Sequence, residues 1–137
     1  KRQFLLWEHS EWCRSHRMIS ILQRIQSLSL NLKIILSVIL IAIVTFLHIM
    51  TTPSLSIETT FSIDKIAHMI VFYFVGLWFF IIAKNIQIFY LFILLCGYAL
   101  SMEFMQMNIS YRSFEWLDWV ADVFGILLSV FHLSKKL

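Results

Sequence analysis

Charged residues are scarce in this chain of 137 residues, since only 14% are Asp, Glu, Lys or Arg while 60% are hydrophobic. A soluble domain of this size cannot bury that much apolar surface. Glycine and proline are also rare, at three and one, which excludes a collagen-like or low-complexity chain. The composition therefore indicates an integral membrane protein, with the lipid bilayer as its principal partner.

Cysteine is nearly absent as well. Cys13 lies in a polar leader and Cys96 lies inside an apolar run, so we expect the two thiols at different depths and predict no disulfide. There is no CxxC pair and no Cys/His zinc spacing, so the sequence assigns neither a cofactor nor a metal ion. The basic residues flank apolar runs instead of forming a stripe on a soluble face, which argues against nucleic-acid binding.

Long apolar runs are abundant. A membrane-spanning helix needs roughly 20 mostly apolar residues to cross a hydrocarbon core of ~30 Å. Four stretches meet this requirement, at about 32–50, 65–83, 86–107 and 114–133. Continuous runs of this length are not typical of strands. The sequence therefore predicts an all-α fold, an integral membrane four-helix bundle.

The distribution of Lys and Arg predicts the orientation of the bundle. With four spans, both termini share a side with the second loop, and nine of the eleven basic residues fall on that side. Because basic residues concentrate on the cytoplasmic side, we expect both termini in the cytoplasm and a multi-pass protein of the bacterial cytoplasmic (inner) membrane. The sequence is also compatible with an oligomer.

The N-terminal leader has a helical pattern of its own. Met18, Ile21, Leu22, Ile25 and Leu28 recur at helical spacing, with polar residues between them. This pattern predicts an amphipathic cytoplasmic helix at the membrane interface, and a helical extension of the first span is the alternative. We accordingly divide the chain into a basic leader, residues 1–31, and a membrane domain, residues 32–137.

Polar side chains near the predicted outer ends of the last three spans form one candidate site. Its residues are Asp64, Lys65, His68, Glu103, Gln106, Arg112, Asp118 and Asp122. Asp64 and His68 are four residues apart and share a helix face. Glu115, Asp118 and Asp122 recur at i, i+3 and i+7 and share one side of the fourth span. Neighbouring antiparallel spans place these ends at one level, so we expect a pocket that opens outward.

Each of these residues also has a plain structural explanation. Asp64 can cap its helix, and His68 can hydrogen-bond a neighbouring helix. Glu103 is expected roughly 10 Å deep at 1.5 Å per residue, where it can pair with Arg112 or Lys65. The five acidic residues of the region outnumber these two cations and leave minus three. That excess favours proton uptake by some carboxyls, or a bound cation or amine.

Three motifs in order resemble the VanZ-like family. The run Asp64-Lys65-Ile66-Ala67-His68 resembles that family's D-K-x-x-H, residues 103–106 its E-x-x-Q, and residues 112–118 its R-x-F-x-x-x-D, closed by Gly125. The resemblance implies a small multi-pass protein of the bacterial cell envelope, related to a founding member linked to teicoplanin resistance. One departure is Asp122, which stands where the family usually carries Asn and makes this site more acidic.

The sequence supports more than one function for this site. We favour binding of an envelope ligand, either a cell-wall precursor lipid or a peptide amine. An enzyme is the first alternative, with His68 as general base oriented by Asp64, or with carboxylates and His68 holding a divalent metal. A polar cluster that only holds the helices together is the second, and a proton-coupled transporter is the least favoured. His48, near the end of the first span, either joins the cluster or marks the membrane interface.

Overall fold

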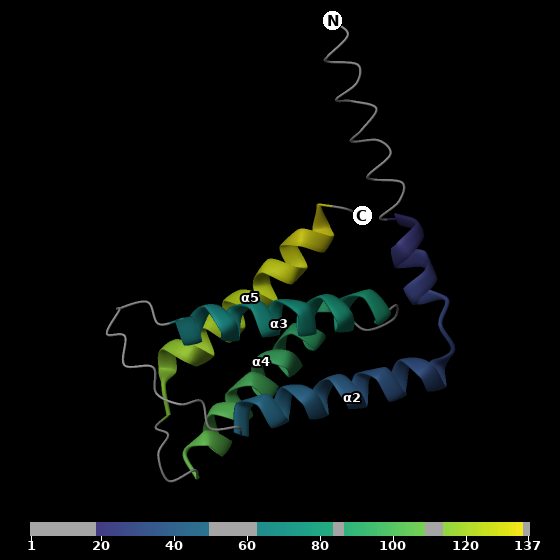
Figure 1. Cartoon of the computed structure of the whole chain (residues 1–137). Coiled ribbons are helices and arrows are strands. Elements are labelled where there is room, and N and C mark those ends of the chain that lie inside the picture. Colours follow the sequence, from purple (N-terminus) through teal and green to yellow (C-terminus); the bar gives the residue numbers. More distant parts are fainter. Residues whose placement is uncertain (1–18, 50–62, 84–86, 109–113, 136–137) are drawn as a thin grey trace, which may run out of the picture.

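The computed structural model describes residues 19–49, 63–83, 87–108 and 114–135, and four long helices dominate them (Figure 1). These are α2 (Leu30–Ile49), α3 (Ile63–Ile82), α4 (Ile88–Gln106) and α5 (Trp116–Ser134). Helices of 19 or 20 residues extend for about 30 Å, the thickness of a bilayer core. All four are long and apolar enough to cross a membrane. The predicted all-α four-helix membrane fold is confirmed.

The helix boundaries agree closely with the sequence pattern. Each helix begins two residues from its predicted start and ends one residue from its predicted end. The agreement follows from the chemistry of the chain, because a backbone in lipid must satisfy its own hydrogen bonds. A helix therefore continues for as long as the apolar run does.

The closest helix pair is α3 with α5, which start at the same end of the bundle (Figure 1). Gly125 permits the approach, since a Cβ there would collide with the Met69 carbonyl oxygen and lie 3.0 Å from the Tyr73 nitrogen. One turn further along, Gly76 packs directly against Ser129. Small residues let helix backbones approach closely in membranes, where van der Waals packing drives association. This pair forms the centre of the bundle.

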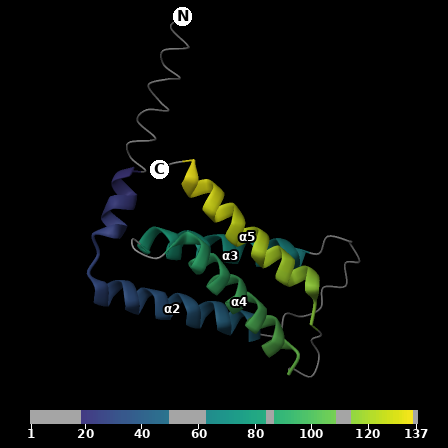
Figure 2. The same cartoon turned by 180° about the vertical axis from the view of Figure 1, so that it is seen from behind.

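The other two helices complete the core. α4 packs against α5 and α3, and α2 packs against α3 and α4, while the backbones of α2 and α5 do not come close to each other. Figures 1 and 2 accordingly show α2 along the edge of the bundle furthest from α5. Phe72, Leu95 and Ile126 are fully buried at the centre, and Val44 is the main contribution of α2.

Two of the hydrogen bonds that attach the peripheral α2 to its neighbours join one side chain to another. Trp78 Nε1 donates to Ser37 Oγ over 2.9 Å, and the hydroxyls of Thr45 and Tyr98 lie 3.0 Å apart. Most other side chains of α2 are large, apolar and exposed. In a bilayer these side chains face lipid tails, which are as apolar as they are, so lipid contact explains their exposure.

A short helix at residues 19–26 precedes α2 and is separate from it (Figure 1). Ser29 Oγ accepts a hydrogen bond from the Leu32 nitrogen at the start of α2, as N-capping residues do. Lys33 Nζ donates to the Gln26 carbonyl oxygen over 2.7 Å and so satisfies the end of the short helix. These contacts explain the break at residues 27–29. The interfacial position of the leader and the division at residue 31 stay predictions.

Candidate functional site

The polar cluster lies at one end of the bundle, which we call the acidic end. There α2 and α4 finish while α3 and α5 begin, so the four helix ends meet (Figure 1). The structure brings together seven of the eight residues predicted from the sequence. These are Asp64, Lys65, His68, Glu103, Gln106, Asp118 and Asp122. The eighth, Arg112, lies outside the described residues.

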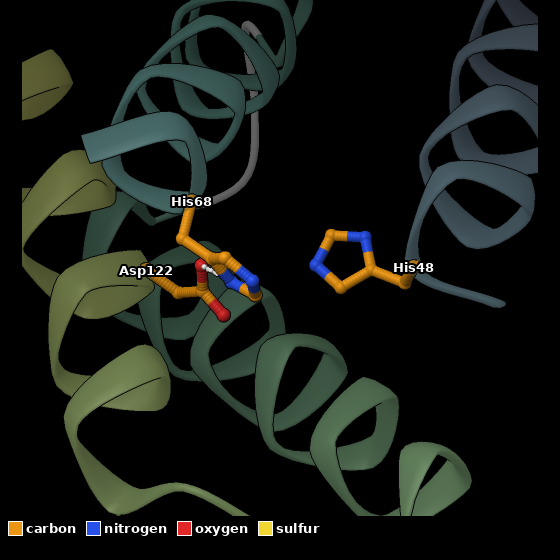
Figure 3. Close-up of side chains that lie close together, drawn as sticks. All are labelled: His48, His68 and Asp122. Carbon is orange, nitrogen blue, oxygen red and sulfur yellow. Dashed lines mark hydrogen bonds and ion pairs between the residues drawn. The ribbon is translucent and has the colours of Figure 1, made fainter. Parts of the chain in front are cut away.

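The deeper part of the cluster is centred on His68. Its Nδ1 lies 3.0 Å from Asp122 Oδ1, at hydrogen-bond distance, and 3.9 Å from Glu103 Oε1. Glu103 and Asp122 are fully buried, and His68 is 6% exposed. Three helices, α3, α4 and α5, therefore direct one imidazole and two carboxyls toward a common point (Figure 3 shows two of these side chains).

His48 completes this deeper part from α2. It is buried, and its ring centre lies 5.0 Å from that of His68 in an edge-to-face arrangement. Its Nδ1 lies 2.8 Å from the Val44 carbonyl oxygen, one turn earlier in α2. Gln106 Nε2 contacts the His48 carbonyl oxygen over 3.4 Å and ties the end of α2 to α4. Of the two readings offered by the sequence, the structure supports membership of the cluster.

The outer part of the cluster is centred on Lys65. Its Nζ lies 2.9 Å from Glu115 Oε2 and 2.7 Å from Asp118 Oδ1. The Asp118 side chain is almost completely buried, at 4% exposure, whereas that of Glu115 is 52% exposed. Asp64 is half-buried, and one of its oxygens lies within 4.8 Å of ligand atoms from His68 and Asp118. The lysine thus pairs with both acids at the start of α5 and neutralises one of their two charges.

The partners inside the cluster differ from the pairs expected from sequence. The spacing in the sequence placed His68 on one helix face with Asp64, but the hydrogen bond of His68 is to Asp122 on α5. Lys65 was a candidate partner for Glu103, but its ion pairs are with residues of α5. Both differences have one cause. Because α3 and α5 pack more closely than any other helix pair, polar side chains on the face of α3 that contacts α5 pair with residues of the neighbouring helix.

Three buried carboxyl oxygens have no hydrogen-bond partner among the described residues. They are both oxygens of Glu103 and Oδ2 of Asp122. Buried polar atoms in proteins are almost always hydrogen-bonded, and an unpaired charge in a low-dielectric interior is costly. A cluster that served only to join helices would be expected to satisfy these oxygens. The arrangement therefore favours a cationic group or protons as additional partners.

The charges of the cluster support the same conclusion. Among the described residues, five carboxyls (Asp64, Glu103, Glu115, Asp118 and Asp122) face a single lysine, Lys65, so the formal sum is minus four before either histidine is counted. Two groups of side chains have possible ligand atoms close enough together to bind one metal ion. They are His48 with His68 and Asp122, and Asp64 with His68 and Asp118. The hydrogen-bonded imidazole and carboxylate of His68 and Asp122 also have the arrangement of a general base with its orienting acid.

Comparison with known proteins places these motifs in a family. No curated protein and no solved structure matches the chain. Residues 8–134 match the VanZ/LLP1 family, which extends the resemblance seen in the three motifs to nearly the whole chain. With its four membrane-spanning helices and a polar cluster built on the motif residues, this multi-pass membrane protein belongs to the VanZ/LLP1 family.

Proposed function

We propose that the acidic end faces the outside of the cytoplasmic membrane and binds the amino group of a cell-envelope ligand. The ligand class is a cell-wall precursor lipid or a peptide that carries a free amine. The bias of Lys and Arg supports the orientation, because nine of eleven basic residues lie on the side of the termini and the second loop and such residues concentrate on the cytoplasmic side. Both termini are then cytoplasmic.

The observation that carries this proposal is the burial and hydrogen bonding of the Glu103 side chain. Its side chain is completely buried, and neither carboxylate oxygen has a side-chain hydrogen-bond partner among the residues that the structure describes. An ammonium group offers three N–H donors and one positive charge, which would satisfy both. The remaining negative charge of the cluster adds attraction, and it acts strongly because little water reaches these side chains.

The same geometry argues against phosphate as the group bound beside Glu103. Lys65 already contacts Glu115 and Asp118 at 2.9 and 2.7 Å, so its charge is neutralised within the protein. An anion near the buried carboxyls of Glu103 and Asp122 would meet like charge.

A binding experiment tests the proposal directly. The probe is a synthetic lipid-linked disaccharide pentapeptide with a free lysine amine, and the matched probe carries the same lysine acetylated. The purified protein in detergent should show a higher thermal unfolding midpoint with the free amine and no increase with the acetylated probe. Glu103→Gln should abolish the increase, whereas Leu94→Ala, on the exposed face of the same helix, should retain it.

A cellular experiment extends the test to glycopeptide resistance, which we include in the proposal. A susceptible bacterium that produces the wild-type chain should tolerate more teicoplanin than one that produces Glu103→Gln at equal membrane abundance. Equal protection by the two proteins, together with equal binding of both probes, would contradict the proposal. That result would favour a purely structural cluster.

A second candidate function rests on the hydrogen bond between His68 and Asp122. A buried imidazole 3.0 Å from a carboxylate has the geometry of a general base, which would make the protein a membrane-embedded enzyme. Incubating the free-amine probe with wild-type protein and with His68→Gln, followed by mass spectrometry, separates the two functions. A product that forms only with the wild type supports catalysis, and an unchanged probe supports binding alone.

A further inference from the structure

We propose that His48, His68 and Asp122 form a binding site for one divalent transition-metal ion, of which Zn²⁺ is the best match. The three side chains come from α2, α3 and α5 and are separated by tens of residues in sequence. One ligand atom from each lies within 4.8 Å of the others. Figure 3 shows the His48 ring pointing toward the His68 ring, with the carboxylate of Asp122 beside His68.

The hydrogen bond of His48 prepares its ring for a metal ion. Nδ1 lies 2.8 Å from the Val44 carbonyl oxygen, and a carbonyl oxygen can only accept, so Nδ1 carries the proton. In the neutral ring, Nε2 then carries the lone pair. Metal-bound histidines characteristically donate their other N–H to a carbonyl or carboxylate, which fixes the tautomer and the ring orientation. His48 has this arrangement within its own helix.

His68 and Asp122 supply the other two ligand atoms. His68 Nδ1 and Asp122 Oδ1 lie 3.0 Å apart, close to the separation of two ligands on one tetrahedral zinc ion, so in the tautomer that carries its proton on Nε2 both atoms can bind the same ion. The other oxygen, Asp122 Oδ2, is buried and has no hydrogen-bond partner among the described residues. A fully buried carboxylate oxygen of this kind is an independent sign of a missing cationic partner. His68 Nδ1 and the Asp122 carboxylate can therefore bind one ion together with His48 Nε2.

The donor set selects the class of ion. Imidazole nitrogen with carboxylate oxygen suits Zn²⁺ and its neighbours in the first transition row, whereas Mg²⁺ and Ca²⁺ prefer oxygen ligands alone. Three protein ligands with an open fourth position are typical of non-structural zinc sites. Zinc bonds to these atoms are about 2.1 Å long, so closing the set around an ion takes side-chain shifts on the order of 1 Å.

The metal site is separate from the proposed amine site, which uses Glu103. The formal charge of minus four among the described residues of the cluster becomes minus two when a divalent ion binds. That remainder still attracts an ammonium group, so the two cations are compatible. Metal binding can therefore hold if amine binding fails, and the reverse is also true.

Metal content of the purified protein tests the inference. The chain is prepared without a histidine tag, and His9 and His16 are replaced by Gln to remove leader histidines. After dialysis against Zn²⁺ we expect one zinc ion per chain by elemental analysis. His48→Gln and Asp122→Asn should lose the ion, whereas His132→Gln, at the opposite end of the bundle, should retain it.

Cobalt provides a readout of direct ligation. The Co²⁺-loaded protein should show the visible absorption of a four-coordinate site, and His48→Cys should retain the ion and add a thiolate-to-cobalt charge-transfer band. This variant preserves a ligand, so it also guards against loss of metal through misfolding. A wild-type protein that takes up neither ion, or a His48→Cys protein with bound cobalt but no new band, overturns the inference.

Crossing the variants separates this inference from the proposed function. His48→Gln should lose zinc but keep the shift in unfolding midpoint with the free-amine probe. Glu103→Gln should keep zinc but lose that shift. If zinc binds while the wild type shows no response to the amine, only the proposed function fails. If the amine response is present and zinc is not bound, only the metal site fails.

Discussion

The two ends of the bundle differ in their helix packing and in the hydrogen bonding of their buried polar groups. At the acidic end, buried carboxyls of Glu103 and Asp122 have oxygens without hydrogen-bond partners among the described residues. Toward the other end, α3 and α5 meet through Gly125, Gly76 and Ser129, and Ser129 Oγ donates to the Ile126 carbonyl oxygen within its own helix. The contrast indicates that close packing holds the bundle together and that the acidic end is arranged for a partner. Paired substitutions can break or sharpen this comparison.

The largest effect is expected at Gly125, where the backbones of α3 and α5 are closest. Gly125→Leu places side-chain atoms against the Met69 carbonyl oxygen and the Tyr73 nitrogen, so the pair must separate. We expect the loss of a monodisperse folded peak in size-exclusion chromatography. Gly97→Leu is the control, because no atom lies within 4 Å of a Cβ at that position, and it should elute like the wild type.

The next effect is expected at Lys65, the one ion-paired cation of the acidic end among the described residues. Lys65→Met leaves Asp118 buried without its cation, and removing one partner of a buried pair costs about 3–5 kcal/mol. Glu115→Gln removes the half-exposed partner of the same lysine and should cost only about 0–1 kcal/mol. Denaturant unfolding in detergent measures both changes. Equal stability of the two variants would show that Asp118 does not depend on Lys65.

A smaller effect is expected from the adjacent leucines of α4. Leu95 is 1% exposed and Leu94 is 65% exposed. Leu95→Ala opens a cavity and should cost about 2 kcal/mol, at the low end for core leucines, because lipid replaces water as the surroundings of the unpacked state. Leu94→Ala should change the free energy of unfolding by less than about 0.5 kcal/mol. Equal costs would contradict the assignment of Leu94 to the lipid-facing surface.

The smallest effect is expected at the end opposite the acidic end. Tyr73 Oη lies 2.7 Å from His132 Nδ1, and hydrogen bonds between membrane helices contribute about 0.6 kcal/mol on average. Tyr73→Phe removes the hydroxyl and keeps the ring, so the same unfolding assay should register a loss of about that size. A loss several times larger would mean that polar contacts also stabilise this end.

Hydropathy was sufficient to predict the four helices, since lipid imposes one backbone solution on every long apolar run. The motif residues also predicted which helix ends carry the polar side chains. The pairs themselves were not predictable, because they depend on how each helix is rotated and how closely it packs. His68 is hydrogen-bonded to Asp122 across the helix pair because Gly125 lets α5 lie against α3. His48 joins the cluster because α2 turns that face inward, which no spacing within α2 indicates.

The unfolding free energy of Glu103→Gln, measured without any ligand, tests most directly whether the acidic end serves a partner. Glu103 has no side-chain hydrogen-bond partner for either oxygen among the described residues, so replacing it with the neutral isostere removes a buried acid that is costly to ionise. The stability of the variant should equal or exceed that of the wild type. A loss of about 3–5 kcal/mol, the cost of breaking a buried ion pair, would contradict this account and make Glu103 a structural residue.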